Sequence, residues 1–291
     1  MENKIETRCG TIAIIGRPNV GKSTLLNKIL GEKLSITSAK PQTTRHQILG
    51  VKTQQNTQWI YLDTPGLHQQ TEHRLSRTMV REAINALAKV DVIGFVIEAG
   101  RWTAEDDAIL QRLQQQEHPV ILIVNKVDKI KDKARLLPFL KSCYEKMSFL
   151  AVIPLSAQKG DNVEALEKTI AEQLPLAEFV YPPDQYTDRN QRFLAAEFIR
   201  EKLMRSLYKE LPYWLTVVIE EFNEEKKLIK ISAVVLTERP GQKAIIIGKK
   251  GELLKKVGTE ARFDMEQCFG KKVYLNLWVK VKAGWAEENN D

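Results

Sequence analysis

Short apolar segments alternate with stretches of helical periodicity through the first 175 residues. Five segments have the length and composition of strands: Thr11–Ile15, Gln58–Leu62, Val92–Ile97, Val120–Val124 and Leu150–Pro154. Helical periodicity is found at Ser23–Leu30, Leu75–Lys89, Ala104–Gln116, Asp132–Lys146 and Val163–Gln173. This alternation predicts an α/β domain with a doubly wound, mostly parallel sheet and helices on both faces. A polar turn at Gln54-Gln55-Asn56 predicts one hairpin, and hence one antiparallel edge strand.

A second pattern follows a proline-containing segment. Pro175, Pro182 and Pro183 are unfavourable in both helices and strands, so residues 175–186 are interpreted as a linker. Beyond the linker the pattern predicts helix, strand, strand, helix, turn, helix and strand, in that order. The length of 291 residues suits two domains. We expect a first domain at 1–174, a smaller α+β domain at 187–283 and a tail at 284–291.

The net charge of +7 is concentrated in the last quarter of the chain. Between Arg239 and Lys282 there are eleven basic and four acidic residues, which accounts for the whole excess. A basic segment of this kind is typical of proteins that bind nucleic acid or an anionic membrane surface, although a solvated lysine-rich face remains an alternative.

No apolar run approaches the length that crosses a bilayer, and the first residues lack the apolar core of a signal peptide. We therefore expect a cytoplasmic protein. The three cysteines, Cys9, Cys143 and Cys268, fit neither a zinc site nor a disulfide framework, and we interpret them as buried or incidental thiols.

A glycine-rich sequence connects the first predicted strand to the first predicted helix. Backbone N–H groups of such a loop, together with the N-terminus of the helix, can surround phosphate groups. In this arrangement Lys22 reaches the β- and γ-phosphates of a nucleotide, and the Ser23 hydroxyl binds Mg²⁺. The residues predicted to bind nucleotide here are Gly16, Arg17, Pro18, Asn19, Val20, Gly21, Lys22, Ser23 and Thr24.

A second motif, Asp63-Thr64-Pro65-Gly66, follows the strand Gln58–Leu62, where ligands gather in a doubly wound sheet. Asp63 can hold Mg²⁺ through water, and the Gly66 N–H can sense a γ-phosphate. Thr43 and Thr44 precede this strand, and either can complete the Mg²⁺ shell in a segment that is ordered by GTP. We assign Thr44 and keep Thr43 as the alternative. The expected catalytic groups are Lys22, Thr44, Asp63 and Gly66.

Asn125, Lys126 and Asp128 follow the strand Val120–Val124 and determine the base. The Asp128 carboxylate can accept hydrogen bonds from N1–H and the exocyclic amine of guanine, and adenine offers neither donor there. Leaving such donors unpaired in a buried site costs several kcal/mol, so the motif favours GTP over ATP. Ser156 and Ala157, after the last strand, fit a backbone contact to the guanine oxygen.

The five nucleotide-binding motifs occur in order, and the sequences Gln42-Thr43-Thr44-Arg45-His46 and Asp63-Thr64-Pro65-Gly66-Leu67-His68 resemble those of the Era family of bacterial ribosome-assembly GTPases. The turn Gly248-Lys249-Lys250-Gly251, in its element order, resembles the KH domain of type II topology. The resemblance covers the chain from Gly10 to Lys282. It implies a P-loop GTPase domain and a KH domain that binds small-subunit ribosomal RNA near its 3′ end during assembly of the small ribosomal subunit. It also implies peripheral attachment to the inner membrane, and we expect a monomer.

Two positions bear on hydrolysis. Many regulatory GTPases carry a glutamine after the glycine of the second motif, but Leu67 stands there and cannot orient water, so intrinsic hydrolysis is expected to be slow. In related GTPases with this phosphate-loop sequence, the residue at Asn19 is associated with a bound K⁺ that supplies positive charge. The alternative is an asparagine that only tolerates the turn geometry.

KH domains hold about four nucleotides of single-stranded RNA, with the glycine-flanked turn admitting the phosphates and an apolar groove receiving bases. Gly248 and Gly251 would give steric room and Lys249 and Lys250 positive charge. The residues predicted to contact RNA are Lys243, Ile245, Ile246, Ile247, Gly248, Lys249, Lys250, Gly251 and Lys255.

Two other functions fit parts of the pattern. The basic region could dock a GTP-controlled adaptor on an anionic membrane, a role that needs no glycine-flanked turn. A phosphotransferase could use the same phosphate loop, but no acceptor pocket or lid sequence is evident, and the guanine motif argues against it.

Overall fold

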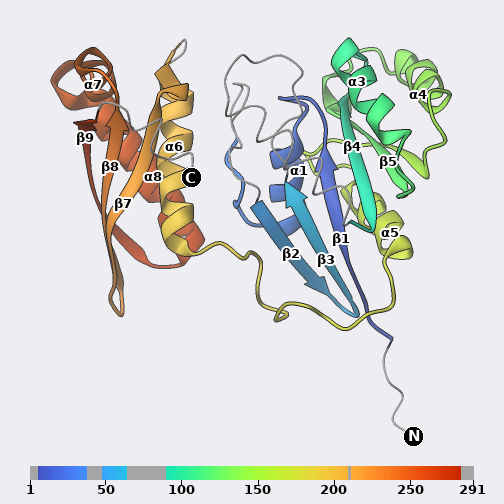
Figure 1. Cartoon of the computed structure of the whole chain (residues 1–291), viewed down its shortest axis with the longest axis horizontal. Helices are drawn as coiled ribbons and strands as arrows, with labels where there is room; N and C mark the ends of the chain where they lie inside the picture. Colours follow the sequence, from blue (N-terminus) through green and yellow to red (C-terminus); the bar gives the residue numbers. More distant parts are fainter. Residues whose placement is uncertain (1–5, 38–47, 64–89, 209–210, 283–291) are drawn as a thin grey trace, which may run out of the picture. The chain divides into compact units, whose positions relative to one another are not determined.

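The computed structural model describes residues 6–37, 48–63, 90–208 and 211–282, so the predicted helix Leu75–Lys89 lies outside it. The described residues form two compact units that divide between Asp188 and Arg189. Figure 1 shows the helices and strands of each unit.

The first unit is built on a six-stranded sheet in the order β2-β3-β1-β4-β5-β6. All neighbouring strands are parallel except the edge strand β2, which pairs antiparallel with β3 in the predicted hairpin. The predicted doubly wound fold is confirmed. The strands are β1 Arg8–Ile15, β2 Ile48–Gln54, β3 Thr57–Asp63, β4 Val92–Glu98, β5 Val120–Asn125 and β6 Ala151–Pro154. The helices described in this unit are α1 Lys22–Leu30, α3 Ala104–Leu113, α4 Leu136–Tyr144 and α5 Val163–Gln173, with 3₁₀ turns at Val127–Lys129 and Lys133–Arg135.

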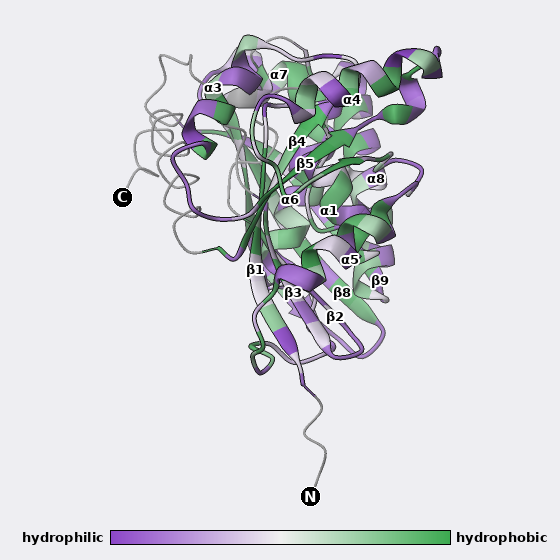
Figure 2. Ribbon diagram, turned by 90° about the vertical axis from the view of Figure 1, so that its right-hand side faces the viewer, coloured by the Kyte–Doolittle hydropathy of each residue, from purple (hydrophilic) through white to green (hydrophobic). Residues whose placement is uncertain are grey.

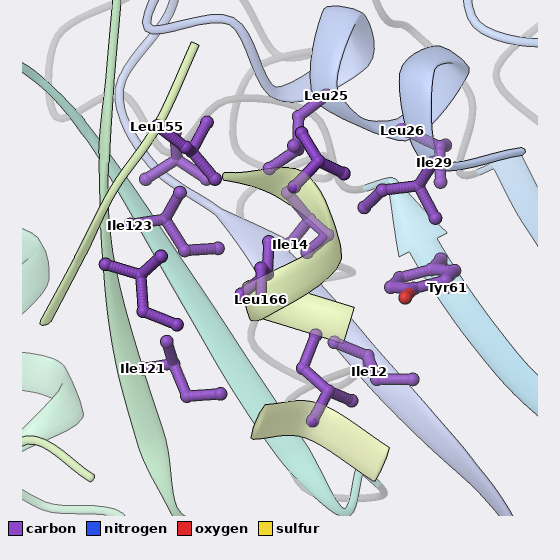
Figure 3. Packing of buried hydrophobic residues seen from close by; sticks show 14 of the residues in the cluster. Ile12, Ile14, Leu25, Leu26, Ile29, Tyr61, Ile121, Ile123, Leu155 and Leu166 are labelled. Atoms are coloured by element: carbon purple, nitrogen blue, oxygen red, sulfur yellow. The ribbon is translucent and has the colours of Figure 1, made fainter. Parts of the chain in front are cut away.

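Helices cover both faces of this sheet, and its central strands β4 and β5 are accordingly apolar at nearly every position and not at alternate positions. On β1, Ile12 and Ile14 pack with α1 and α5, as the close-up in Figure 3 shows. Ala13 and Ile15, which point to the opposite face, pack in a second cluster that contains residues of α3 and α4. The central strands β4 and β5 are accordingly hydrophobic along their length (Figure 2).

The segment 175–186, interpreted from its prolines as a linker, is fastened to the first unit. The fully buried Gln58 of β3 accepts a hydrogen bond from the backbone N–H of Tyr181 and donates one to its carbonyl, at 3.0 and 2.8 Å. Val51 of the edge strand β2 donates to the carbonyl of Tyr186 at 2.9 Å. An edge strand leaves backbone groups unpaired, and this segment satisfies one of them.

The second unit has the predicted order of elements, which is the type II arrangement of a KH domain. Its sheet runs β7-β8-β9, with β7 antiparallel and β9 parallel to the central β8. The elements are α6 Gln191–Ser206, β7 Leu215–Glu224, β8 Leu228–Thr237, α7 Pro240–Ile247, α8 Glu252–Phe269 and β9 Lys272–Val281, with 3₁₀ turns at Leu211–Tyr213 and Lys249–Gly251.

All three cysteines are free thiols, and Cys9 and Cys143 are buried, as expected. Among the described residues, no helix is both long enough and apolar enough to span a bilayer.

Candidate functional site

The loop between β1 and α1 requires glycine at two positions. A Cβ on Gly16 would lie 2.3 Å from the Val96 carbonyl oxygen, and one on Gly21 would lie 2.3 Å from Nδ2 of Asn125. Both glycines also have positive φ, at +152° and +101°, and Asn19 adopts φ +62°. The loop therefore approaches its neighbours through bare backbone, which leaves N–H groups accessible to phosphate oxygens.

Lys22 opens helix α1 and is only 8% exposed. Its ammonium donates to the carbonyls of Gly16 and Arg17, at 2.9 and 3.0 Å. Burial lowers the pKa of Lys22 to about 8; the nearby Asp63 carboxylate raises it, and Arg17 lowers it further. The loop thus holds a cation whose charge is incompletely compensated, which is the condition under which phosphate binds strongly.

Replacing Lys22 with methionine is expected to abolish phosphate binding and to leave the fold intact. Truncating one partner of a buried charged pair costs about 2–5 kcal/mol of binding energy. Isothermal titration calorimetry with GDP measures this loss, and an unchanged affinity would contradict the role of Lys22.

The pH dependence of stability follows from the same side chain. The folded state binds the lysine proton more weakly than an unfolded chain with the ordinary pKa of 10.5, so the nucleotide-free protein gains stability as pH rises from about 8 to 10.5. The methionine variant lacks the free-energy cost of burying a charged ammonium group. It should unfold at a higher temperature than the wild type at about pH 7, by a difference that shrinks at about pH 10; thermal unfolding without nucleotide measures both.

Ser23 and Asp63 meet beside Lys22. The Ser23 hydroxyl donates to Oδ2 of Asp63 at 3.0 Å. Asp63 is fully buried, and its Oδ1 accepts no hydrogen bond from any described residue. Burial raises the pKa of this carboxyl, and Lys22 and the Ser23 hydroxyl lower it less. A hydroxyl and a buried carboxylate with a spare oxygen are the donors that Mg²⁺ prefers, so the residues present fit the ion.

The residues expected to recognise the base are held against the phosphate loop by hydrogen bonds. Asn125 donates from Nδ2 to the Val20 carbonyl at 2.8 Å and accepts at Oδ1 from the Ala157 N–H at 2.9 Å. Asp128 accepts a 2.6 Å hydrogen bond from the Ser156 hydroxyl. Asn125 therefore joins the loop to the Ser156–Ala157 turn, and Ser156 orients the carboxylate expected to recognise guanine.

The side chains of two predicted nucleotide-binding residues have protein partners instead. The Arg17 guanidinium pairs with Glu98 and Asp106. Val20 is fully buried in the core beneath the loop, so only its backbone is available to a ligand. Pro18 is half-buried and Asn19 is exposed, while Thr24 follows Ser23 in the first turn of α1. Thr43, Thr44, Thr64, Pro65 and Gly66 lie outside the described residues.

Sequence reasoning did not identify Glu98 and Asp106. Glu98 ends β4, at the edge of the sheet where ligands gather, and this position was an available signal. Asp106 is the third residue of α3, where it accepts hydrogen bonds from Thr103 in a capping box. Because a capping box already accounts for an acidic residue at this position, the sequence offered no reason to expect that Asp106 also contacts Arg17.

The glycine-flanked turn of the second unit has the predicted form. Gly248 ends α7 with φ +74°, and a Cβ there would lie 2.7 Å from Cβ of Leu253. Gly251 precedes α8 with φ +79°, and a Cβ there would meet nothing within 4 Å. The first glycine is thus required by contact and the second by its backbone conformation alone.

Unpaired positive charge gathers around this turn. Lys249, Lys250 and Lys255 are exposed, Lys243 is half-buried, and none forms an ion pair with a described residue. Farther along the chain, by contrast, Lys271 and Lys280 pair with glutamates. The charge excess inferred from composition is therefore available chiefly at the turn.

One predicted RNA contact is corrected. Ile246 is fully buried, because its position on α7 faces the core of the unit. Ile245 is 58% exposed and Ile247 is half-buried, so these two can meet a base. A run of three isoleucines in a helix cannot present all three to one groove.

Similarity to known proteins extends over nearly the whole chain. A family profile described as a 50S ribosome-binding GTPase matches residues 11–126, and a KH domain profile matches residues 210–286. The chain is 55% identical to GTPase Era of Pseudomonas fluorescens over 99% of its own length and 96% of the relative's. It is 56% identical to GTPase Era of Pseudomonas aeruginosa, over 97% and 92%.

Two solved structures agree with the fold of the whole chain. A crystal structure of Era in complex with MgGDPNP and nucleotides 1506–1542 of 16S ribosomal RNA has a TM-score of 0.91 and 41% identity, covering 97% of this chain and 96% of that chain. A point variant of Aquifex aeolicus Era bound to GDP and aluminium fluoride has a TM-score of 0.92 and 40% identity, covering 97% of both chains.

Proposed function

The chain belongs to the Era family of GTPases, and from this premise we propose that it binds small-subunit ribosomal RNA near its 3′ end and acts in assembly of the small ribosomal subunit. As a GTPase, it hydrolyses GTP to GDP and phosphate. The observation that carries the RNA proposal is the turn Gly248–Gly251 with its unpaired lysines. An Era protein with 41% identity to this chain was crystallised with a 16S ribosomal RNA fragment.

We propose the following roles at the nucleotide site. Ser23 binds Mg²⁺ directly and Asp63 through water, and Thr44, or Thr43 instead, completes the shell. The ion would neutralise charge that develops on the β- and γ-phosphates. Lys22 adds positive charge at these phosphates, and the Gly66 N–H senses the γ-phosphate. The orphaned Asp63 oxygen and the MgGDPNP in the related Era structure support this arrangement.

Potassium is the proposed source of further positive charge in hydrolysis. Arg17 is engaged by two carboxylates, and Leu67 cannot orient water. Neither residue therefore assists hydrolysis, and a bound cation other than Mg²⁺ would supply the further positive charge. Hydrolysis is expected to be at least about tenfold faster in K⁺ than in Na⁺, a modest share of what one electrostatic contact can give. Steady-state phosphate release in the two salts measures the difference.

Asn19→Gly is the matched variant for potassium, because glycine tolerates φ +62° and removes only the side chain. The variant should hydrolyse GTP at the same rate in both salts. A preserved K⁺ preference would remove the Asn19 side chain from the mechanism.

At the second domain we propose that Lys249 and Lys250 contact phosphates, with Lys243 and Lys255 flanking them, while Ile245 and Ile247 receive bases.

We propose that the protein works as a monomer in the cytoplasm, with peripheral attachment to the inner membrane. A membrane contact through the basic region would need no glycine-flanked turn. Binding to anionic vesicles that survives Gly251→Asp, while RNA binding is lost, would identify that contact as separate.

A further inference from the structure

Arg17 belongs to the phosphate loop, but its guanidinium is held by carboxylates of two other elements. Nε lies 3.2 Å from Oδ2 of Asp106 on α3, and Nη2 lies 3.3 Å from Oε2 of Glu98 at the end of β4. The arginine is only 7% exposed. Its planar fork therefore spans two acidic partners, a geometry that a lysine cannot reproduce.

The Asp106 carboxylate is buried at a cost in free energy. It is fully buried, and its Oδ2 accepts hydrogen bonds from the Thr103 N–H and hydroxyl as well as from Arg17. Its Oδ1 accepts none from any described residue. Burial raises the pKa of this carboxyl, although Thr103 and Arg17 lower it in part. Capping a helix does not require an aspartate to be buried. The ion pair with Arg17 offsets part of the cost of burying this carboxylate.

Glu98 extends the same network to the base-recognition motif. Its Oε1 lies 3.2 Å from Nζ of Lys126, while its Oε2 pairs with Arg17. Nζ of Lys126 in turn donates to the backbone carbonyl of Asn19 in the phosphate loop at 2.6 Å. Burial raises the pKa of Glu98, but Lys126 and Arg17 outweigh it and hold the pKa below its usual range. Glu98 therefore holds the phosphate loop at two points: at Arg17 directly, and at the Asn19 carbonyl through Lys126.

We propose that Arg17 is a positioning residue for nucleotide binding. Its ion pairs with Asp106 and Glu98 hold the backbone of the phosphate loop in the conformation that receives phosphates, and its guanidinium touches no phosphate itself. Since both of its neighbours are acidic, the arginine adds almost no net positive charge to the site. This inference rests on the nucleotide site and is independent of the proposed RNA binding.

Affinity for GDP and GTP separates positioning from direct contact. The double variant Arg17→Met with Asp106→Asn removes one positive and one negative charge, so it leaves the net charge of the site unchanged. It is expected to weaken both nucleotides by the same factor, about tenfold, or about 1.4 kcal/mol. The dependence of its affinity on salt should stay as in the wild type. A direct phosphate contact would instead weaken GTP more than GDP and flatten the salt dependence, because a charge facing phosphate is lost. Either of those two results would overturn the proposal.

Two further variants make the test independent of simple loss of packing. Arg17→Lys keeps the charge but cannot span both carboxylates, so it should lose nearly as much affinity as Arg17→Met; wild-type affinity would contradict positioning. Asp106→Asn should reproduce the loss, and the double variant Arg17→Met with Asp106→Asn should be at most about twofold weaker than either single one. If the losses of nucleotide affinity in the two single variants added fully in the double variant, Arg17 and Asp106 would act independently, which would contradict the proposal.

Arg101→Met is the matched control, since Arg101 is an exposed arginine three residues beyond Glu98 that forms no ion pair with a described residue. It removes the same charge and should leave nucleotide affinity unchanged. Circular dichroism of each variant establishes folding, and Arg17→Lys carries the test if Arg17→Met does not fold. A wild-type protein that bound neither nucleotide would show that the site itself was misassigned, which is a distinct failure.

Discussion

Asp128→Asn is expected to convert the nucleotide site from GTP binding to XTP binding. The wild-type carboxylate is proposed to accept from two guanine donors, and each such charge-assisted hydrogen bond is worth about 1.5–3 kcal/mol. An amide cannot accept both, so GTP affinity should fall about 1,000-fold or more. Xanthine carries an oxygen in place of the exocyclic amine, and the asparagine amide can donate to it. Competition of GTP and XTP against a fluorescent nucleotide measures both affinities.

Ser156→Ala provides the matched control for base recognition. It removes the hydroxyl that donates to Asp128 at 2.6 Å but leaves the carboxylate in place. GTP affinity should fall by about tenfold or less, as expected for one hydrogen bond, and GTP should remain preferred over XTP. If Asp128→Asn kept wild-type GTP affinity, the assignment of guanine recognition to Asp128 would be wrong.

Gly251→Asp is expected to lower RNA affinity by about 100-fold or more. The substitution puts a negative charge where Lys249 and Lys250 are proposed to meet phosphates, and like charges in contact cost several kcal/mol. No described atom lies within 4 Å of the new Cβ, and aspartate is one of the few residues that adopt a positive φ, so the variant should fold. Wild-type affinity should also fall linearly with the logarithm of salt concentration, as counterion release requires. Filter binding over a salt series measures both effects.

Two controls separate charge from backbone strain in this experiment. Gly251→Asn has nearly the same shape as the aspartate and tolerates positive φ, but adds no charge, so most RNA affinity should remain. Gly270→Asp introduces the same residue at a similar φ of +64°, after the other end of α8, and should leave RNA binding unchanged. Salt-insensitive RNA binding retained by Gly251→Asp would contradict the KH site.

The sheet and the two glycine-rich turns could be predicted because local rules determine them. Apolar strands without alternation require a sheet covered on both faces, and the pattern placed β1, β4 and β5 within one to three residues of their observed bounds. Gly16 and Gly21 are predictable for a similar reason, since a loop that approaches phosphates needs positive φ and no side chain.

Contacts between residues far apart in sequence could not be predicted in this way. Gln58 looks like an ordinary polar residue on a strand, and only the fold shows that it anchors a segment more than 120 residues later. Arg17 was grouped with the phosphate-binding residues because nothing local reveals Asp106, 89 positions away. Prolines indicated where regular structure stops at 175–186, but they carry no information on whether the chain there is free or docked.

Binding to the end of the small-subunit ribosomal RNA tests the central claim most directly. The full chain, loaded with magnesium and a non-hydrolysable GTP analogue, is titrated with an RNA that corresponds to nucleotides 1506–1542 of 16S ribosomal RNA, the fragment crystallised with the related Era protein. A scrambled RNA of equal length and composition serves as the reference. The account predicts at least about 100-fold tighter binding to the ribosomal fragment at moderate salt, which is below the roughly 1,000-fold or more that typically separates specific from non-specific nucleic-acid binding. Equal affinity for the two RNAs would contradict it.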